Sequence, residues 1–270
     1  MERTLGLMAG AGVLPGQMAA EAARQGWRVV AFSFRDAPGL ERCAHTVVQS
    51  RLTDIGSVLD GLRDARVAAV VFAGHLSRRV FFDESGADSA TRRILSTAGG
   101  LSETALASAV LETLTGLGIE VLDQRLFLSS LLVPSGPVTV RIPSEAEWKE
   151  IALGLRLARG CAAFGIGQTV VVARGATVAV EAIEGTSETI RRGCRLAGPG
   201  TVVVKAVAPR HDYRFDVPTV GLETLTTMAE GKARILAMEG GKVLLLEREA
   251  VLQLADREGI AIVSVDSDVG

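Results

Sequence analysis

Residues 5–34 hold the pattern that most restricts the fold: an apolar strand, a glycine-rich turn, a helix and a second apolar strand. We expect the strands at 5–9 and 28–34, and a helix over 17–25 that ends at Gly26, a residue typical of helix C-termini. Two such strands separated by one helix pair in parallel through a right-handed crossover. The start of the chain therefore predicts an α/β domain built on a parallel sheet.

The same alternation continues to about residue 125, with strands expected at 67–73 and 119–122 and helices at 54–66, 88–97 and 103–117. It stops at residues 132–143, a stretch with three prolines that predicts a linker. We therefore expect two domains. Residues 1–131 form a Rossmann-like N-terminal domain with a parallel sheet, and residues 144–270 form a second α/β domain with a mixed sheet, which we expect to be the catalytic one.

The second domain opens with a capping box, Ser144 with Glu147, that begins a helix running to about residue 159. A hairpin is predicted from two apolar runs separated by a turn at Arg174 and Gly175. Its strands are expected at 169–173 and 177–181. The remaining elements are expected as helices at 187–196, 222–230 and 248–258 and strands at 201–206, 242–247 and 260–265.

Composition excludes several classes of function. The net charge of -2 and the 4% aromatic content argue against nucleic-acid binding, because there is neither a basic excess nor a platform for stacking bases. The three cysteines are far apart and the three histidines show no ligand spacing, which indicates a reducing compartment and no structural zinc site. The uncharged runs 4–20 and 126–140 are interrupted by glycine and proline, so we expect a cytoplasmic protein without a membrane span.

The turn after the first strand has the shape of a phosphate-binding loop. Gly10 and Gly12 permit close approach of a ligand, and the amides at a helix N-terminus favour an anion. Pro15 stands where the third glycine of the nicotinamide-dinucleotide pattern would fall, so that standard pattern is broken. We assign Gly10, Ala11, Gly12, Leu14 and Pro15 to substrate binding, with a plain tight turn as the alternative.

Three further groups could contact phosphate oxygens. His75, Ser77 and Arg78 follow the third strand, where open parallel sheets place their ligands. Lys205 ends an apolar strand, and a lysine there can act as a point charge for phosphate. A strand passes into a helix at Glu184, Gly185 and Thr186. The alternatives are a surface loop with a capping serine, a lysine at a sheet edge, and a solvated turn.

The segment after Lys205 carries Asp212, Arg214 and Asp216 at alternate positions. If the segment is extended, the three side chains point to one face, with the two carboxylates roughly 13 Å apart at Cα. Such a row could hold a metal ion or a phosphate. A solvated, salt-bridged loop is the alternative.

Taken together, segments 5–15, 73–78, 166–168, 179–186 and 204–221 resemble the UDP-2,3-diacylglucosamine pyrophosphatase family of the lipid A pathway, the type unrelated to calcineurin-like phosphoesterases. The resemblance implies a magnesium-dependent hydrolase that produces UMP and 2,3-diacylglucosamine 1-phosphate (lipid X). It implies a catalytic role for Asp216, which could also bind the metal, and adds Gln168, Arg214 and Thr219 to the substrate-binding residues. It further implies transient contact with the inner membrane surface, and it leaves a homodimer open.

The chain departs from the family pattern at Thr104, Gly165 and Ser187, where the family carries carboxylates. Because magnesium sites depend on the charge of their oxygen ligands, these replacements predict weaker or rearranged metal binding. They motivate a rival hypothesis, a family member that binds or senses a nucleotide-sugar lipid without cleaving it. A nicotinamide-dependent oxidoreductase is a second rival, and it requires cofactor binding at the turn 10–15.

Overall fold

The computed structural model describes residues 3–76 and 86–266. The chain divides into two compact units. The N-terminal unit comprises Met1–Ser129 together with Asp212–Asp216, and the C-terminal unit comprises Ser130–His211 and Val217–Gly270. Residues 212–216, which carry the alternating charges, thus belong with the N-terminal unit, whereas the residues on either side of them belong with the C-terminal unit.

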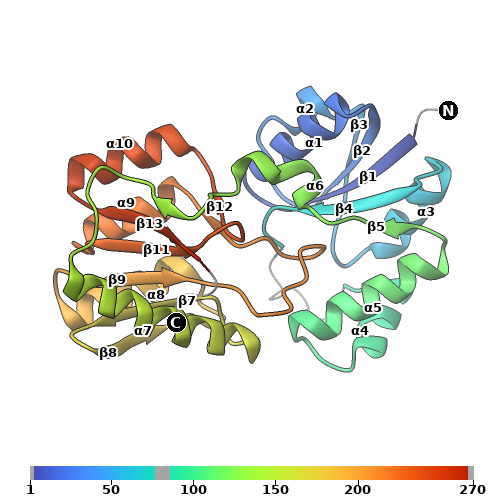
Figure 1. Ribbon diagram of the computed structural model, residues 1–270. Helices are drawn as coiled ribbons and strands as arrows, with labels where there is room; N and C mark the ends of the chain where they lie inside the picture. Colours follow the sequence, from blue (N-terminus) through green and yellow to red (C-terminus); the bar gives the residue numbers. More distant parts are fainter. Residues whose placement is uncertain (1–2, 77–85, 267–270) are drawn as a thin grey trace. The chain divides into compact units, whose positions relative to one another are not determined.

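The N-terminal unit contains a five-stranded sheet in the order β3-β2-β1-β4-β5, and every pair of strands in it is parallel (Figure 1). The chain order reverses between β1 and β4, and parallel sheets bind ligands beyond the carboxyl ends of such strands. The strands are β1 (Arg3–Ala9), β2 (Trp27–Ser33), β3 (Thr46–Gln49), β4 (Ala69–Ala73) and β5 (Glu120–Val121). The helices are α1 (Leu14–Arg24), α2 (Leu40–Cys43), α3 (Ile55–Asp64), α4 (Ser89–Ala98), α5 (Glu103–Gly116) and α6 (Arg125–Leu128), followed by a 3₁₀ turn at Ser129–Leu131.

The core of the N-terminal unit explains why a distant segment joins it. Apolar side chains of the sheet, among them Phe32 and Val70, pack with α3 and α5. Phe215 packs against the same cluster, and its ring lies 5.2 Å from that of Phe72 between centroids. Covering an aromatic ring of this size stabilises the contact by about 1–2 kcal/mol. Segment 212–216 is therefore anchored to the N-terminal unit by an apolar side chain.

The C-terminal unit contains a mixed six-stranded sheet in the order β6-β13-β11-β9-β7-β8. β9, β11 and β13 are parallel to one another, whereas β7 is antiparallel to both of its neighbours. Its strands are β6 (Gly136–Pro137), β7 (Thr169–Ala173), β8 (Ala176–Val180), β9 (Val202–Lys205), β11 (Ile235–Glu239) and β13 (Ala261–Val265). A separate pair is formed by β10 (Thr219–Val220) and β12 (Leu244–Leu245). The helices are α7 (Glu145–Ala163), α8 (Thr186–Ala197), α9 (Leu222–Glu230) and α10 (Arg248–Glu258).

Helices cover both faces of this sheet (Figure 1). Ile151 and Leu155 of α7 pack on the face that carries Val170 and Val204. α8, α9 and α10 pack on the opposite face, where Val203 and other alternate strand residues lie. Successive strand residues point to opposite faces, so a strand covered on both sides is apolar at every position. The unbroken valine runs at 170–172 and 202–204 are explained in this way.

Several predicted elements are confirmed and others need correction. The capping box at Ser144 and Glu147 is formed, and the hairpin lies where it was expected. Helix α7 does not end at residue 159 but continues to Ala163, because Gly160 stays helical and the left-handed glycine is Gly165, with φ of +66°.

The second correction concerns β11, a central strand that the sequence analysis missed. Its apolar run covers only the four residues 235–238 and follows the charged segment 230–234, so the run did not stand out from a loop. The strand expected at 242–247 is reduced to the two residues of β12. Within the described residues, no helix is both long enough and apolar enough to cross a membrane.

Candidate functional site

Two predicted ligand loops of the N-terminal unit lie against each other. The amide of Ala11 donates to the carbonyl of His75 at 2.9 Å, and the amide of His75 donates to the carbonyl of Ala11 at 3.0 Å. Gly10 donates to the carbonyl of Ala73 at 2.8 Å. The structure therefore brings the turn after β1 and the turn after β4 together. Ser77 and Arg78 lie outside the described residues.

The glycines of these turns serve different purposes. A side chain at Gly10 would begin 2.6 Å from the His75 carbonyl oxygen, so this glycine is required by the chain's own packing. Gly12 has φ of +101° and open space where a side chain would begin. It precedes α1, whose first residues Leu14 and Pro15 are buried and whose N-terminus has no side-chain cap in the described structure. Gly12 and the start of α1 are thus the part of the turn suited to an anion.

We expect Gly10→Ala to lower the free energy of unfolding by about 2 kcal/mol, because the new methyl group must displace backbone atoms. The matched control is Gly116→Ala at the end of α5, where no atom lies within 4 Å of the added carbon and φ is not positive. Urea unfolding of the two variants checks the prediction. A Gly10→Ala protein as stable as the control would show that the two turns can separate.

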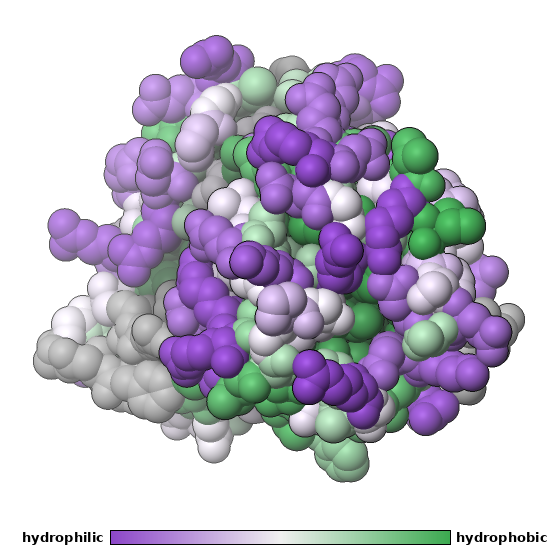
Figure 2. Space-filling view, turned by 90° about the vertical axis from the view of Figure 1, so that its left-hand side faces the viewer, coloured by the Kyte–Doolittle hydropathy of each residue, from purple (hydrophilic) through white to green (hydrophobic). Residues whose placement is uncertain are grey.

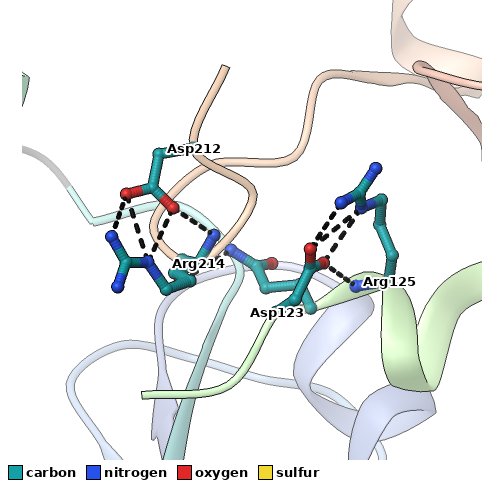
Figure 3. Close-up of polar contacts among 5 residues, drawn as sticks. Asp123, Arg125, Asp212 and Arg214 are labelled. Atoms are coloured by element: carbon teal, nitrogen blue, oxygen red, sulfur yellow. Dashed lines mark hydrogen bonds and ion pairs between the residues drawn. The ribbon is translucent and has the colours of Figure 1, made fainter. Parts of the chain in front are cut away.

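The charged row predicted at 212–216 is not extended. The amides of Phe215 and Asp216 both point back to the carbonyl of Asp212, at 3.3 and 3.5 Å, so the segment is a turn. Asp212 and Arg214 face each other rather than lying side by side on a strand, and their ion pair spans 2.8 Å (Figure 3). The prediction of a flat row is therefore wrong. The carboxylate accepts a bond from the Arg214 amide at 3.0 Å, which closes the turn locally.

A second charged pair, missed by the sequence analysis, supports this turn from the loop after β5. Asp123 and Arg125 form an ion pair of 2.6 Å, drawn beside the first in Figure 3. The Arg125 guanidinium lies 3.8 Å from the centroid of the Tyr213 ring, and the Gln124 amide donates to the Tyr213 carbonyl at 3.2 Å. The sequence offered one signal for this pair. Asp123 and Arg125 lie just after a strand of the parallel sheet, where such sheets place functional residues.

The electrostatics of these pairs are coupled. Burial by itself would raise the pKa of Asp123, but hydrogen bonds from the side chain and backbone of Arg125 outweigh it and lower that pKa. The Asp212 carboxylate opposes the lowering. A hydrogen bond to Asp212 in turn raises the pKa of Arg214, whose side chain remains partly exposed. The four charges largely neutralise one another and hold the turn that precedes Asp216.

The lowered pKa of Asp123 predicts a pH dependence of stability. A carboxyl group whose pKa is lower in the folded state stabilises the fold above its unfolded pKa of about 4, and this contribution disappears as the pH falls through the folded pKa. We therefore expect Asp123→Asn to flatten the acid side of a plot of unfolding free energy against pH. Arg125→Gln should flatten it similarly, because it removes the main cause. Unchanged slopes in both variants would contradict the assignment.

In the C-terminal unit, the predicted residues gather at one edge of the sheet. β8 and β9 end there and β7 begins there, because β7 is antiparallel to both. Lys205 is only 8% exposed, and its ammonium donates to the Thr186 hydroxyl at 3.1 Å. That hydroxyl donates to the Glu181 carboxylate at 2.7 Å, and the same carboxylate accepts from the backbone amide of Gln168 at 3.2 Å. We call Gln168, Glu181, Thr186 and Lys205 the Lys205 cluster.

The Lys205 cluster adjoins the N-terminus of a helix. Thr186 is the first residue of α8, and Gly185 before it has φ of +86° and provides no side-chain cap. Among the described residues, Lys205 makes no ion pair with a carboxylate. A buried ammonium and helix amides that no side chain caps favour an anion, and the Glu181 carboxylate offsets part of this positive charge.

Neighbouring residues at this edge already have partners. Glu184 forms an ion pair of 2.7 Å with Arg192. A hydrogen bond from its own backbone amide is the main cause of its lowered pKa, with burial opposing and Arg192 adding to the effect. Ser187, one of the positions where a carboxylate was expected, donates to Glu223 at 2.7 Å. Thr219 begins β10, and its hydroxyl donates to the Val217 carbonyl at 3.4 Å rather than to a residue of the Lys205 cluster.

A buried carboxylate on β11, Glu239, lies at the same end of the sheet and makes several polar contacts there. Glu239 is 2% exposed and contacts Arg159 at 3.3 Å and Lys242 at 2.8 Å. It also accepts from the amide of Val207 at 3.0 Å, just beyond Lys205. A buried charge is tolerated only when it is paired in this way. Glu239 thus ties the chain that leaves Lys205 to the neighbouring strand.

The described residues contain no group of three or more histidine, cysteine, aspartate or glutamate side chains arranged to hold a metal ion. This part of the chain therefore offers no closed protein cage for a metal. Magnesium commonly binds through one or two carboxylates, with substrate phosphates and water as the remaining ligands. Asp216 at the end of the 212–216 turn suits that open kind of site.

Comparisons with known proteins match one family model to each half of the chain. The model of the LpxI N-terminal domain matches residues 4–131, and that of the LpxI C-terminal domain matches residues 134–263. The UDP-2,3-diacylglucosamine pyrophosphatase LpxI of Caulobacter vibrioides is 32% identical over 279 residues, covering 98% of each chain.

Two solved structures show much lower similarity. A putative epimerase from Burkholderia cenocepacia J2315 gives a TM-score of 0.32 at 14% identity, over 99% of this chain and 84% of that one. N5-carboxyaminoimidazole ribonucleotide synthetase from Thermotoga maritima gives 0.25 at 13% identity, over 65% of this chain and 40% of that one. Scores this low do not indicate a shared fold. The two matched domains and the relative of nearly equal length instead lead to one conclusion: the chain belongs to the LpxI family.

Proposed function

We propose that this protein hydrolyses the pyrophosphate bond of UDP-2,3-diacylglucosamine, releasing UMP and 2,3-diacylglucosamine 1-phosphate. The observation that carries the proposal is the Lys205 cluster: a buried ammonium beside an uncapped helix N-terminus, in a chain of the LpxI family. The Caulobacter relative is named for this activity. Water adds to one phosphorus, the bond from that phosphorus to the bridging oxygen breaks, and the products share the released proton with solvent.

The chain offers positive groups for the charge that develops as the bond breaks. Lys205 and the amides at the start of α8 suit one phosphate group. Gly12 and the N-terminus of α1 suit a second anionic or nucleotide group. His75 lies against this turn, and Arg214 is partly exposed beside Asp216. We assign Asp216 the catalytic role, in which its carboxylate orients the attacking water or binds a metal ion.

We further propose that magnesium assists the reaction. The ion would be held by Asp216 together with oxygens of the pyrophosphate, and when bound it would neutralise negative charge on the phosphates. Thr104, Gly165 and Ser187 occupy positions expected to carry carboxylates, and Ser187 already bonds Glu223. We therefore expect the protein to require a higher magnesium concentration than relatives that carry those carboxylates.

Because the proposed substrate carries acyl chains, we expect the reaction to take place at the cytoplasmic face of the inner membrane. Hydrophilic residues predominate on the face of the C-terminal unit seen in Figure 2, with smaller hydrophobic patches between them. A surface of this mixed kind supports transient contact with a membrane rather than stable insertion.

The direct test is UMP release from UDP-2,3-diacylglucosamine by the purified protein, with magnesium and with a chelator in its place. We expect UMP with magnesium and at least a tenfold slower release with the chelator. Binding of the substrate without any UMP would instead support the sensing function. Binding of NAD(P) measured by calorimetry, without substrate cleavage, would favour an oxidoreductase.

A further inference from the structure

Three large apolar side chains are exposed at one end of the β7–β8 hairpin in the C-terminal unit. Phe164 is 84% exposed, Ile166 is 50% exposed, and Ile183 is 60% exposed. Phe164 and Ile166 lie in the loop between α7 and β7, and Ile183 lies in the loop between β8 and α8. A loop directed to water is usually polar, so a cluster of this kind marks a contact surface. We call Phe164, Ile166 and Ile183 the apolar loop surface.

The two loops touch each other and adjoin the Lys205 cluster. Gly167 packs so closely on Glu181 that an added Cβ would lie 2.2 Å from the Glu181 carbonyl oxygen. The Gln168 amide donates to the Glu181 side chain, and the Glu181 amide donates to the Thr169 carbonyl at 2.9 Å. Ile166 is two residues from Gln168, and Ile183 is two residues from Glu181. The two loops that carry the apolar loop surface therefore also carry residues of the predicted anion site.

Other exposed apolar residues of this unit lack that connection. Val140 and Ile142 lie in the segment before α7, and Leu196 lies in the last turn of α8, at the opposite end from Thr186. They are 89%, 66% and 64% exposed, comparable with the three loop residues. They provide control residues that are apolar and similarly exposed, and they lie outside the two loops that adjoin the Lys205 cluster.

We propose that the apolar loop surface contacts the acyl chains of the lipid whose phosphate is held at the Lys205 cluster. The inference rests on the proposed function. The Lys205 ammonium and the N-terminus of α8 favour an anionic head group, and the Glu181 carboxylate offsets only part of that charge. The side chains of Phe164, Ile166 and Ile183 offer hydrocarbon for the acyl chains. Each methylene removed from water contributes favourably to binding. The affinity for the lipid should therefore increase with acyl-chain length if the chains contact the apolar loop surface.

The experiment compares the triple variant Phe164→Ser, Ile166→Ser, Ile183→Ser with the control variant Val140→Ser, Ile142→Ser, Leu196→Ser. UMP release is measured for UDP-2,3-diacylglucosamine with long and with short acyl chains, dispersed in detergent micelles. We expect kcat/KM of the loop variant to fall about tenfold for the long-chain substrate, mainly through KM. The short-chain substrate should be cleaved almost as by wild type, and the control variant should stay within about twofold throughout.

Three results would overturn the inference. An equal fall for both chain lengths would mean that the loops support the Lys205 cluster and do not contact acyl chains. A fall seen only when the substrate is presented in phospholipid vesicles would assign the surface to the bilayer. An effect of the same size in the control variant would mean a general loss of solubility.

A failure of the proposed function is distinguishable from these results. If wild type releases no UMP, binding of 2,3-diacylglucosamine 1-phosphate with long and short chains is measured by calorimetry. Weaker binding of the long-chain lipid by the loop variant alone would support the acyl contact even without hydrolysis. Equal binding by wild type and both variants would overturn it.

Discussion

Replacing Asp216 with asparagine is expected to slow UMP release by about 10²- to 10⁴-fold, the range typical for the loss of a group that activates a nucleophile. The substitution removes the charge and keeps the size of the side chain. Asp216 ends a turn held by the Asp212–Arg214 pair and by Phe215 packed on the core, so the fold should remain intact. Steady-state kinetics and unfolding measurements on the same preparation check both expectations.

The matched control is Asp212→Asn, a second carboxylate in the same turn that is held by Arg214. It should slow the reaction far less, because its role is to shape the turn. A magnesium titration then distinguishes the two proposed roles of Asp216. Asp216→Glu would raise the magnesium requirement if the carboxylate binds the ion, and would alter the pH profile if it orients water. Full activity in Asp216→Asn would remove Asp216 from the mechanism.

Lys205→Met is expected to lower kcat/KM by about 10²- to 10³-fold, because the variant loses the buried positive charge that we propose binds the pyrophosphate. The same change should leave the unfolding free energy unchanged or higher. Methionine fills similar space, and a buried ammonium that makes no ion pair in the described structure costs free energy to desolvate. A loss of activity without a loss of stability is the expected signature of a binding residue.

Lys149→Met provides the comparison for this variant. Lys149 is exposed and forms a 3.2 Å ion pair with Glu145 on the surface of α7, a kind of pair that contributes little. The control should change neither activity nor stability. If Lys205→Met were instead destabilised with its activity retained, Lys205 would be a structural residue, held by Thr186 alone.

Local patterns in the sequence predicted the elements whose causes are themselves local. The capping box depends on Ser144 and a residue three positions later, and the β7–β8 hairpin depends on its turn, where Arg174 and Gly175 both have positive φ. β11 was missed because five residues ending in Glu239 do not look like a buried strand. That carboxylate is acceptable only because Arg159, Lys242 and the Val207 amide surround it in the folded chain.

The same distinction holds for the candidate site. The sequence by itself determined which residue types are present and at which strand ends they stand, including Lys205, Thr186 and the glycines at 10 and 12. It also indicated the family through long motifs. Only the tertiary structure decided that segment 212–216 forms a turn packed on the N-terminal unit, and that Asp123 and Arg125 support it.

The physical reason is that these arrangements depend on partners distant in the chain. Phe215 packs against Phe72, which is more than a hundred residues away in the chain. The Lys205 ammonium contacts the Thr186 hydroxyl because the end of β9 and the start of α8 lie together at one end of the sheet. A period of two or of 3.6 residues records which face of an element is apolar, but not what that face will meet. Packing between distant segments supplies that information, and with it the surroundings of each charged side chain.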